Sequence, residues 1–350
     1  MDDSIDRSSF ESFLTGDMPS DIDVESLPVS NERIVSTRCA PLPLPRSDFG
    51  CCLAGGRLFV CGGHIGPVHR YRDEDITDDL STYDPRSDRW HALAPRPRRA
   101  QGASLIARER YLYAFGGACP HGPTTRDDFG LRTTRAIDRY DILADRWETL
   151  GNLADGRSSF AMATHGNSAL LIGGWSVTDG HPTGSMLPGV ERFDFETEQS
   201  GSCSVLPPSP LRRAIASSED PVVPDAILLA GGLTAGSRFS AVLADFWRMN
   251  LGSGRLERLP NLPVRRFGPS LARLGGTLLL AGGYDVVRHA PVASILCMES
   301  NSVSWQRCTD SPIEPRIMAA TAHVGGGTLL IGGQSAAGIP TGAVELLRFA

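Results

Sequence analysis

The stretch LFVCGG at residues 58–63 decides the fold, because its pattern of an apolar run ending in two glycines returns five more times along the chain. The other copies are YLYAFGG at 111–117, ALLIGG at 169–174, AILLAGG at 226–232, TLLLAGG at 277–283 and TLLIGG at 328–333. Successive glycine pairs begin 54, 57, 58, 51 and 50 residues apart. A regular period of this length predicts an array of similar structural units.

A second pattern follows the glycine pairs. Tyr83 precedes Trp90 by seven positions, and Tyr140 precedes Trp147 by the same interval. The third copy keeps the aromatic residue, Phe193, but has a serine in place of the tryptophan, so we expect the third unit to be the most degenerate. Large rings at fixed positions are suited to fill the wedge between neighbouring sheets.

Each repeat also opens with an arginine that lies 16 to 18 residues before its glycine pair. These are Arg46, Arg99, Arg157, Arg213, Arg266 and Arg316. The repeat therefore predicts four strands: strand a after the arginine, strand b ending in the glycines, strand c with the aromatic residue and strand d with the tryptophan. Two glycines are expected where the backbone passes so close to the next unit that no Cβ fits.

This combination resembles the kelch repeat, and the resemblance covers residues 34–350. It implies an all-β chain, a six-bladed kelch β-propeller with four-stranded antiparallel blades. The last repeat ends at Ala350 after strand c, whereas residues 33–46 align with the strand d segments and place Arg38 at the tryptophan position. We therefore expect an N-terminal strand to close the last blade, so that the propeller spans residues 33–350.

The first 33 residues carry nine acidic residues against two arginines, a local charge of −7 within a chain whose net charge is −6. Such a segment buries too little apolar surface to offset the entropy of ordering it, so we expect residues 1–32 to be a disordered acidic tail. Phe10, Phe13 and Leu14 form its hydrophobic group. The SSFESFL segment that holds them is either a docking motif or part of a solubilising tail.

The rest of the composition limits the class of protein. All 34 basic residues are arginine, which reflects either codon preference or selection against ubiquitin attachment to lysine. The eight cysteines show neither a disulfide framework nor zinc spacing, and Cys61 is expected in the core. No apolar stretch reaches 18 residues and the N-terminus is acidic, so we expect a soluble protein of the cytoplasm, with the nucleus as an alternative.

The resemblance implies a role for the arginines. In kelch domains that recruit proteins, arginines near the start of strand a point to the mouth of the central channel. If this chain is similar, Arg46, Arg99, Arg157, Arg213, Arg266 and Arg316 form a cationic ring that binds the carboxylates of an acidic peptide. The alternative is that these arginines pair with loop carboxylates or backbone carbonyls and only hold the blades together.

The connections between strands b and c offer a second set of candidates. They are longest at residues 64–79, 118–134 and 175–189, so the loop face should be widest over the first three blades. His64, Trp175 and Tyr284 each follow a glycine pair directly, at the end of strand b. We expect these three to contact a partner.

The most consistent interpretation is a monomeric, non-catalytic protein-interaction module, an adaptor or scaffold, with no metal or other cofactor and no contact with nucleic acid or membrane. The alternative is a small-molecule enzyme, because sialic acid epimerases share a kelch-like propeller. A deep pocket at the channel mouth, with a buried carboxylate or histidine beside an arginine, would favour the enzyme. An open, shallow face would favour protein binding.

Overall fold

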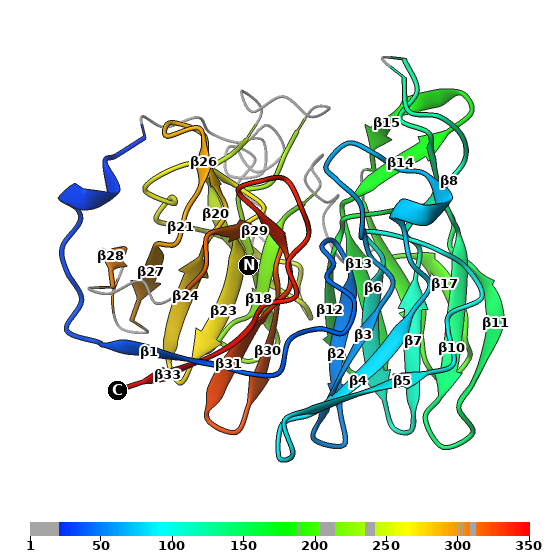
Figure 1. The fold of residues 1–350 in the computed structure, drawn as a ribbon, viewed down its shortest axis with the longest axis horizontal. Helices are drawn as coiled ribbons and strands as arrows, with labels where there is room; N and C mark the ends of the chain where they lie inside the picture. The colour runs from blue at the N-terminus through cyan, green and yellow to red at the C-terminus, as the bar shows by residue number, and fades with distance from the viewer. Residues whose placement is uncertain are drawn as a thin grey trace, which may run out of the picture.

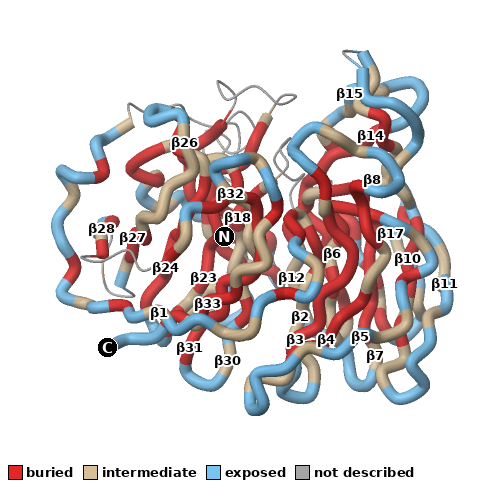
Figure 2. Tube along the Cα trace, viewed as in Figure 1, coloured by how far each residue is buried: buried red, intermediate tan, exposed pale blue. Residues whose placement is uncertain are grey.

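The computed structural model describes residues 21–125, 127–187, 189–203, 214–234, 242–299, 302, 304–308 and 313–350. Its regular structure consists of strands, with two short 3-10 turns, η1 (Val24–Ser26) and η2 (Asp73–Asp75). Figure 1 shows these strands as stacked, twisted sheets, and Figure 2 shows that their middles are buried while the connecting loops are exposed. The prediction of an all-β chain is confirmed. Across the described ranges, no helix is long and apolar enough to cross a membrane.

Among the described residues six antiparallel sheets have four strands each. Sheets 1 and 2 are β2 (Gly50–Ala54), β3 (Arg57–Cys61), β4 (Leu80–Asp84), β5 (Arg89–Leu93) and β6 (Ser104–Arg108), β7 (Tyr111–Phe115), β10 (Ala136–Asp141), β11 (Arg146–Asn152). Sheets 3 and 4 are β12 (Ala161–His165), β13 (Ser168–Ile172), β16 (Val190–Asp194), β17 (Gln199–Ser202) and β18 (Ala216–Glu219), β19 (Ala226–Ala230), β20 (Phe246–Asn250), β21 (Leu256–Leu259). Sheets 5 and 6 are β23 (Ser270–Leu274), β24 (Thr277–Ala281), β27 (Ile295–Met298), β28 (Gln306–Arg307) and β30 (Ala320–Val324), β31 (Gly327–Ile331), β33 (Val344–Phe349), β1 (Ile34–Arg38).

Shorter strands form the connections on one face. Two hairpins, β8 with β9 and β14 with β15, rise above sheets 2 and 3 at the upper right of Figure 1. The bounds of the shorter strands are β8 (Ala118–Pro120), β9 (Leu131–Thr133), β14 (Trp175–Thr178), β15 (His181–Met186), β22 (Arg266–Phe267), β25 (Tyr284–Asp285), β26 (Ala290–Pro291), β29 (Arg316–Ile317) and β32 (Gln334–Ser335).

The glycine pairs lie where one sheet meets the next. A Cβ on Gly116 would lie 2.4 Å from the carbonyl oxygen of Arg157, and the amide of Gly117 donates to that oxygen at 2.8 Å. At the other end of the chain, a Cβ on Gly332 would lie 2.6 Å from the carbonyl oxygen of Arg46. Real Cβ contacts are not this short, so the expectation that no Cβ fits beside the next unit is confirmed at both places.

Backbone bonds between residues of positive φ connect the sheets. Gly102 donates to Asp48 at 2.7 Å, Ser159 donates to Gly102 at 2.8 Å, and Ala214 donates to Ser159 at 2.8 Å, which joins sheets 1 to 4 in order. Across sheets 5 and 6, Met318 makes the corresponding bond to Gly268. Each of these residues has φ between 52° and 62°, the left-handed conformation that a sharp turn of the backbone requires.

The tryptophans connect neighbouring sheets on the outer side. The Trp90 ring lies 5.0 Å from the Tyr83 ring, and its Nε1 donates to the carbonyl oxygen of Ala40, which follows β1. Trp147 packs on Tyr140 in the same way and donates to the carbonyl oxygen of Ala94, which follows β5. The predicted position of the large rings between sheets is therefore confirmed.

Strand β1 is the outer strand of sheet 6. It pairs antiparallel with β33, and Ser36 lies opposite Leu347. Leu347 pairs with β31 at the same register position at which Tyr83 pairs with β3. Because the residue opposite Tyr83 is the tryptophan of its sheet, Ser36 takes the place of the tryptophan here. The alignment that put Arg38 at that place was wrong by two residues, since Arg38 lies opposite Glu345.

Residues 21–32 differ from the disordered tail that we expected over 1–32. The amide of Ile22 donates to the carbonyl oxygen of Pro263, and Val24 is buried in the hydrophobic cluster of sheets 4 and 5. Further along, the amide of Ser30 bonds to Arg307 in β28. Asp21 pairs with Arg265 before β22, and Glu25 pairs with Arg307 in β28, which helps to offset the entropy of ordering this segment. Residues 1–20 lie outside the described part of the chain.

Candidate functional site

Four of the six predicted strand a arginines are buried. Arg46, Arg157, Arg266 and Arg316 are at most 3% exposed. Each guanidinium donates to the carbonyl oxygen of the first glycine in the pair of its own sheet. The corresponding glycines are Gly62, Gly173, Gly282 and Gly332.

Three of these arginines also pair with a carboxylate that precedes or begins strand c. Arg46 bonds to Asp79 at 2.5 Å, Arg157 bonds to Glu191 at 2.9 Å, and Arg316 pairs with Glu345. Burial lowers the guanidinium pKa of Arg157 and that of Arg316, which falls to about 10. The described arginines therefore do not form a cationic ring open to a ligand. They take the alternative role, in which they hold strands a, b and c of one sheet together.

The second sheet departs from this pattern. In this sheet Ala100 occupies the place of the strand a arginine. Its carbonyl oxygen accepts a hydrogen bond from the Gly63 amide, just as the carbonyl oxygen of Arg157 accepts one from the Gly117 amide. Arg96 replaces the missing guanidinium from the preceding loop, bonding to Asp138 at 2.8 Å and to the Gly116 carbonyl oxygen at 3.1 Å.

The remaining two predicted arginines lie apart from this network. Arg99 is exposed and donates to the backbone oxygen of Asp73. Arg213 lies outside the described residues.

A cavity of about 620 Å³ opens on the face that carries the long loops. Its lining comes from the connections of all six sheets, and it includes the predicted residues His64, Trp175 and Tyr284. Its wall also includes Asp48, Ser159 and Met318, which take part in the backbone bonds between sheets. The structure therefore brings three predicted loop-face residues together around one space.

The wall of the cavity is mainly apolar and aromatic. Phe129, Phe267 and Tyr71 line it along with Trp175 and Tyr284, and no arginine belongs to the described lining. Such a surface suits an apolar ligand with few polar groups.

Gln101 adds one polar group to this wall. The side chain is 7% exposed, and its Oε1 has no hydrogen-bond partner among the residues that the structure describes. This oxygen has almost no exposed surface, so it does not present an acceptor to a ligand in the cavity.

His64 is buried in the wall and is already bonded. Its Nε2 donates to the backbone oxygen of Arg70 at 2.7 Å, and burial lowers the pKa of its imidazole. The Arg70 guanidinium in turn holds both oxygens of the buried Asp75, at 2.8 and 2.9 Å. A histidine and a carboxylate therefore do lie beside an arginine, but these groups bond to one another and shape the loop at 64–79.

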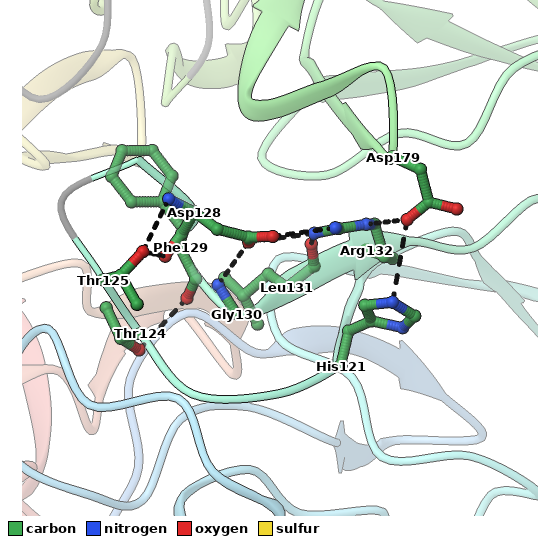
Figure 3. Close-up of polar contacts among 9 residues, drawn as sticks. All are labelled: His121, Thr124, Thr125, Asp128, Phe129, Gly130, Leu131, Arg132 and Asp179. Carbon is green, nitrogen blue, oxygen red and sulfur yellow. Dashed lines mark hydrogen bonds and ion pairs between the residues drawn. The ribbon is translucent and has the colours of Figure 1, made fainter.

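Ionic contacts fix the loop that carries Phe129. Arg132 bonds to Asp128 at 2.8 Å and to Asp179 at 2.7 Å, which joins the β8–β9 hairpin to the β14–β15 hairpin (Figure 3). Asp128 also accepts from the Gly130 amide at 2.8 Å. The Phe129 ring then lies 5.7 Å from the Trp175 ring, so this network positions two aromatic parts of the wall.

This network predicts a dependence on pH. Bonding to Arg132 and to the Gly130 amide lowers the pKa of Asp128 from 3.8 to about 2. A lowered carboxyl pKa stabilises the folded loop fully above about pH 4, and that stabilisation is lost as the pH falls through 2. We expect the NMR signal of the Trp175 indole to shift over this range, and Asp128→Asn to give the shifted position at neutral pH.

The matched control is Asp84→Asn, because the pKa of Asp84 is also lowered but its carboxyl lies in the turn after β4. The Trp175 signal of this variant should still titrate as in the wild type. A wild-type signal that stays constant from pH 4 to 2 while the fold persists would contradict the role of Asp128.

Several wall residues were not among the predicted site residues. Gln101 and Phe267 follow the strand a arginine position directly, as do Ser47 and Ile317, which also line the cavity. The residue after that position is therefore a signal that sequence reasoning could have used. Phe129 has no such signal, because its place depends on contacts between two loops.

An all-β chain built from four-stranded antiparallel sheets, with glycine pairs where one sheet meets the next, is a repeat protein of the propeller class. A kelch motif matches residues 45–97. The chain therefore carries a kelch motif and is similar to kelch-repeat proteins.

Three relatives illustrate the similarity. The chain is 24% identical to kelch-like protein 25 of Xenopus tropicalis over 279 residues, which cover 78% of this chain and 42% of that one. It is 27% identical to kelch-like protein 35 of Mus musculus, with 79% and 43% covered, and 23% identical to kelch-like protein 34 of Homo sapiens, with 74% and 38% covered. The chain spans less than half the length of the relatives that it matches.

Proposed function

We propose that this chain is a closed six-bladed propeller that binds a protein partner at the cavity on its loop face. Six four-stranded sheets, and β1 as the fourth strand of the last one, support the ring. The functional part of the proposal rests on the cavity, because its mainly apolar wall is built from the connections of all six sheets. Aromatic side chains that become fully buried in an interface often contribute most of its binding energy.

The role that follows is an adaptor or scaffold, acting in the cytoplasm as a monomer. The similarity to kelch-like proteins supports protein interaction in general. The acidic peptide inferred from six exposed arginines loses support, because four of them are buried and bonded inside their sheets. An apolar segment of a partner fits the wall better.

The test compares how much of each partner three immobilised proteins recover. A cell extract is passed over the immobilised full chain, over a Trp175→Ala/Tyr284→Ala variant and over Arg99→Ala, whose side chain lies outside the cavity lining. Losing two central aromatic residues should reduce partner recovery by about tenfold or more, whereas Arg99→Ala should retain it. Equal recovery from all three proteins, with unchanged melting temperatures, would contradict the proposal.

A small-molecule enzyme remains the second candidate, because the cavity volume falls in the range of small-ligand sites and His64 is buried in its wall. The discriminating measurement is a thermal shift with an N-acetylated hexosamine as the probe. Our proposal predicts no shift. A stabilisation that disappears in His64→Gln would favour the enzyme.

A further inference from the structure

The chain enters the described part of the molecule beside the cavity. The carboxylate of Asp21 accepts from the Arg265 guanidinium at 2.8 Å and from the Arg265 amide at 2.9 Å. Two residues further on, Phe267 lines the cavity. Whatever precedes Asp21 therefore begins at the rim of this space.

More acidic residues keep the segment in this place. Asp23 and Glu25 lie 3.5 and 3.6 Å from the Arg288 guanidinium, and Glu25 also lies 3.3 Å from that of Arg307. Arg288 belongs to the turn between β25 and β26, and that turn is flanked by the lining residues Tyr284 and Pro291. The anchor thus combines several ionic contacts on one sector of the rim, although each exposed pair alone is weak.

The sequence before the anchored residues Asp21, Asp23 and Glu25 contains side chains that fit the apolar wall of the cavity. Phe10, Phe13 and Leu14 stand within the acidic segment, and Leu14 lies seven positions before Asp21. Seven residues extend up to about 24 Å, at roughly 3.3–3.6 Å each. A chain anchored at Asp21 can extend over this length, so we infer that the hydrophobic group can enter the cavity while the chain stays anchored.

We propose that Phe10, Phe13 and Leu14 of this chain occupy the cavity as a ligand in cis. The inference rests on the proposed function and adds the chemistry of the ligand: aromatic and aliphatic side chains at positions i, i+3 and i+4, flanked by carboxylates. The side chains match the aromatic wall of the cavity. The flanking carboxylates stay outside, because no arginine belongs to the described lining.

A tethered segment competes strongly with a partner. A short linker gives an effective concentration of about 1 mM, so a partner must present a similar segment and displace the one already bound. Partner binding at this cavity is then regulated by the chain's own N-terminal segment.

The first test locates the segment in the full chain. Benzoylphenylalanine at Phe13 should crosslink, on irradiation, to peptides that contain Gln101, Trp175 or Tyr284 of the same molecule. The matched control places the same group at Ile22, which is exposed and bonded through its backbone to Pro263, and should crosslink to the rim near that residue. Crosslinks from position 13 to surfaces outside the cavity, or between isotopically labelled and unlabelled chains, would overturn occupancy in cis.

The second test measures competition. The probe is a labelled synthetic peptide of residues 5–16, and the proteins are the wild type and a Phe10→Ser/Phe13→Ser/Leu14→Ser variant with an unchanged charge. The peptide should bind the variant at least tenfold more tightly, because the competing segment is gone, and a further Tyr284→Ala change should weaken it again. Equal affinity for wild type and triple variant would overturn the proposal.

The two proposals can fail separately. If partner recovery depends on Trp175 and Tyr284 but the peptide does not bind, the cavity is a partner site and the inference about the segment is wrong. If position 13 crosslinks to the cavity but partner recovery is the same for the wild type and the cavity variants, the segment is the occupant and the proposed function is wrong.

Discussion

Glu191→Ala is expected to lower the free energy of unfolding by about 3–5 kcal/mol, because it leaves a buried guanidinium without its counter-charge. Glu191 and Arg157 are each 3% exposed and bond at 2.9 Å. The same carboxylate also accepts from the Ala154 amide at 2.7 Å and from the Ser200 hydroxyl at 2.8 Å. Chemical denaturation followed by circular dichroism measures the loss.

Two variants show whether the uncompensated charge is the cause. Glu74→Ala removes an ion pair of similar length, 3.0 Å to Arg72, in which both side chains are more than half exposed, and should cost less than about 1 kcal/mol. Arg157→Met/Glu191→Leu removes both charges and should recover much of the loss. If Glu191→Ala costs no more than Glu74→Ala, the buried pair does not hold sheet 3 together as described.

Gly116→Ala should be similarly damaging. At φ 56° the new methyl group would lie 2.4 Å from the Arg157 carbonyl oxygen, a backbone atom that cannot move without displacing sheet 3. Left-handed strain contributes about 1–2 kcal/mol and overpacking about 1–3 kcal/mol more. The melting temperature and the denaturation midpoint should both fall.

The chain offers a matched control in Gly166→Ala. Gly166 has the same φ of 56°, but nothing lies within 4 Å of the position that its Cβ would take. This variant should show the backbone strain alone, and the difference between the two variants measures the close approach of the neighbouring sheet. Equal losses would mean that the approach contributes nothing.

The glycine pairs and the rings made the strand pattern predictable, because each is required by a local contact that repeats in every sheet. The register of the arginines was less predictable. The connection before sheet 2 carries Arg96, Arg98 and Arg99 close together, and only the backbone bond from Gly63 shows that Ala100 takes the repeat position. The tryptophan position of β1 was hard to predict for a similar reason. Ser36 takes it rather than Arg38, and a strand without the large ring has no residue that marks its register.

The depth of a side chain is also hard to predict from spacing. Arg46 and Arg157 stand where exposed arginines were expected, but carboxylates that lie 33 and 34 residues further along the chain draw them into the sheets. His64, Trp175 and Tyr284 were correctly placed on the loop face, since each directly follows a glycine pair at the end of strand b. Their function as partner contacts stays a prediction.

The pairing of β1 with β33 has a consequence for biosynthesis. Ile34 lies opposite Phe349, so β1 finds its partner only after the residues that separate the two strands have been synthesised. At about 5–20 residues per second, the few hundred residues between them take about 15 to 60 s. During that interval the nascent chain exposes an unpaired strand, and this is the period in which a chaperone or an unwanted second chain would meet it.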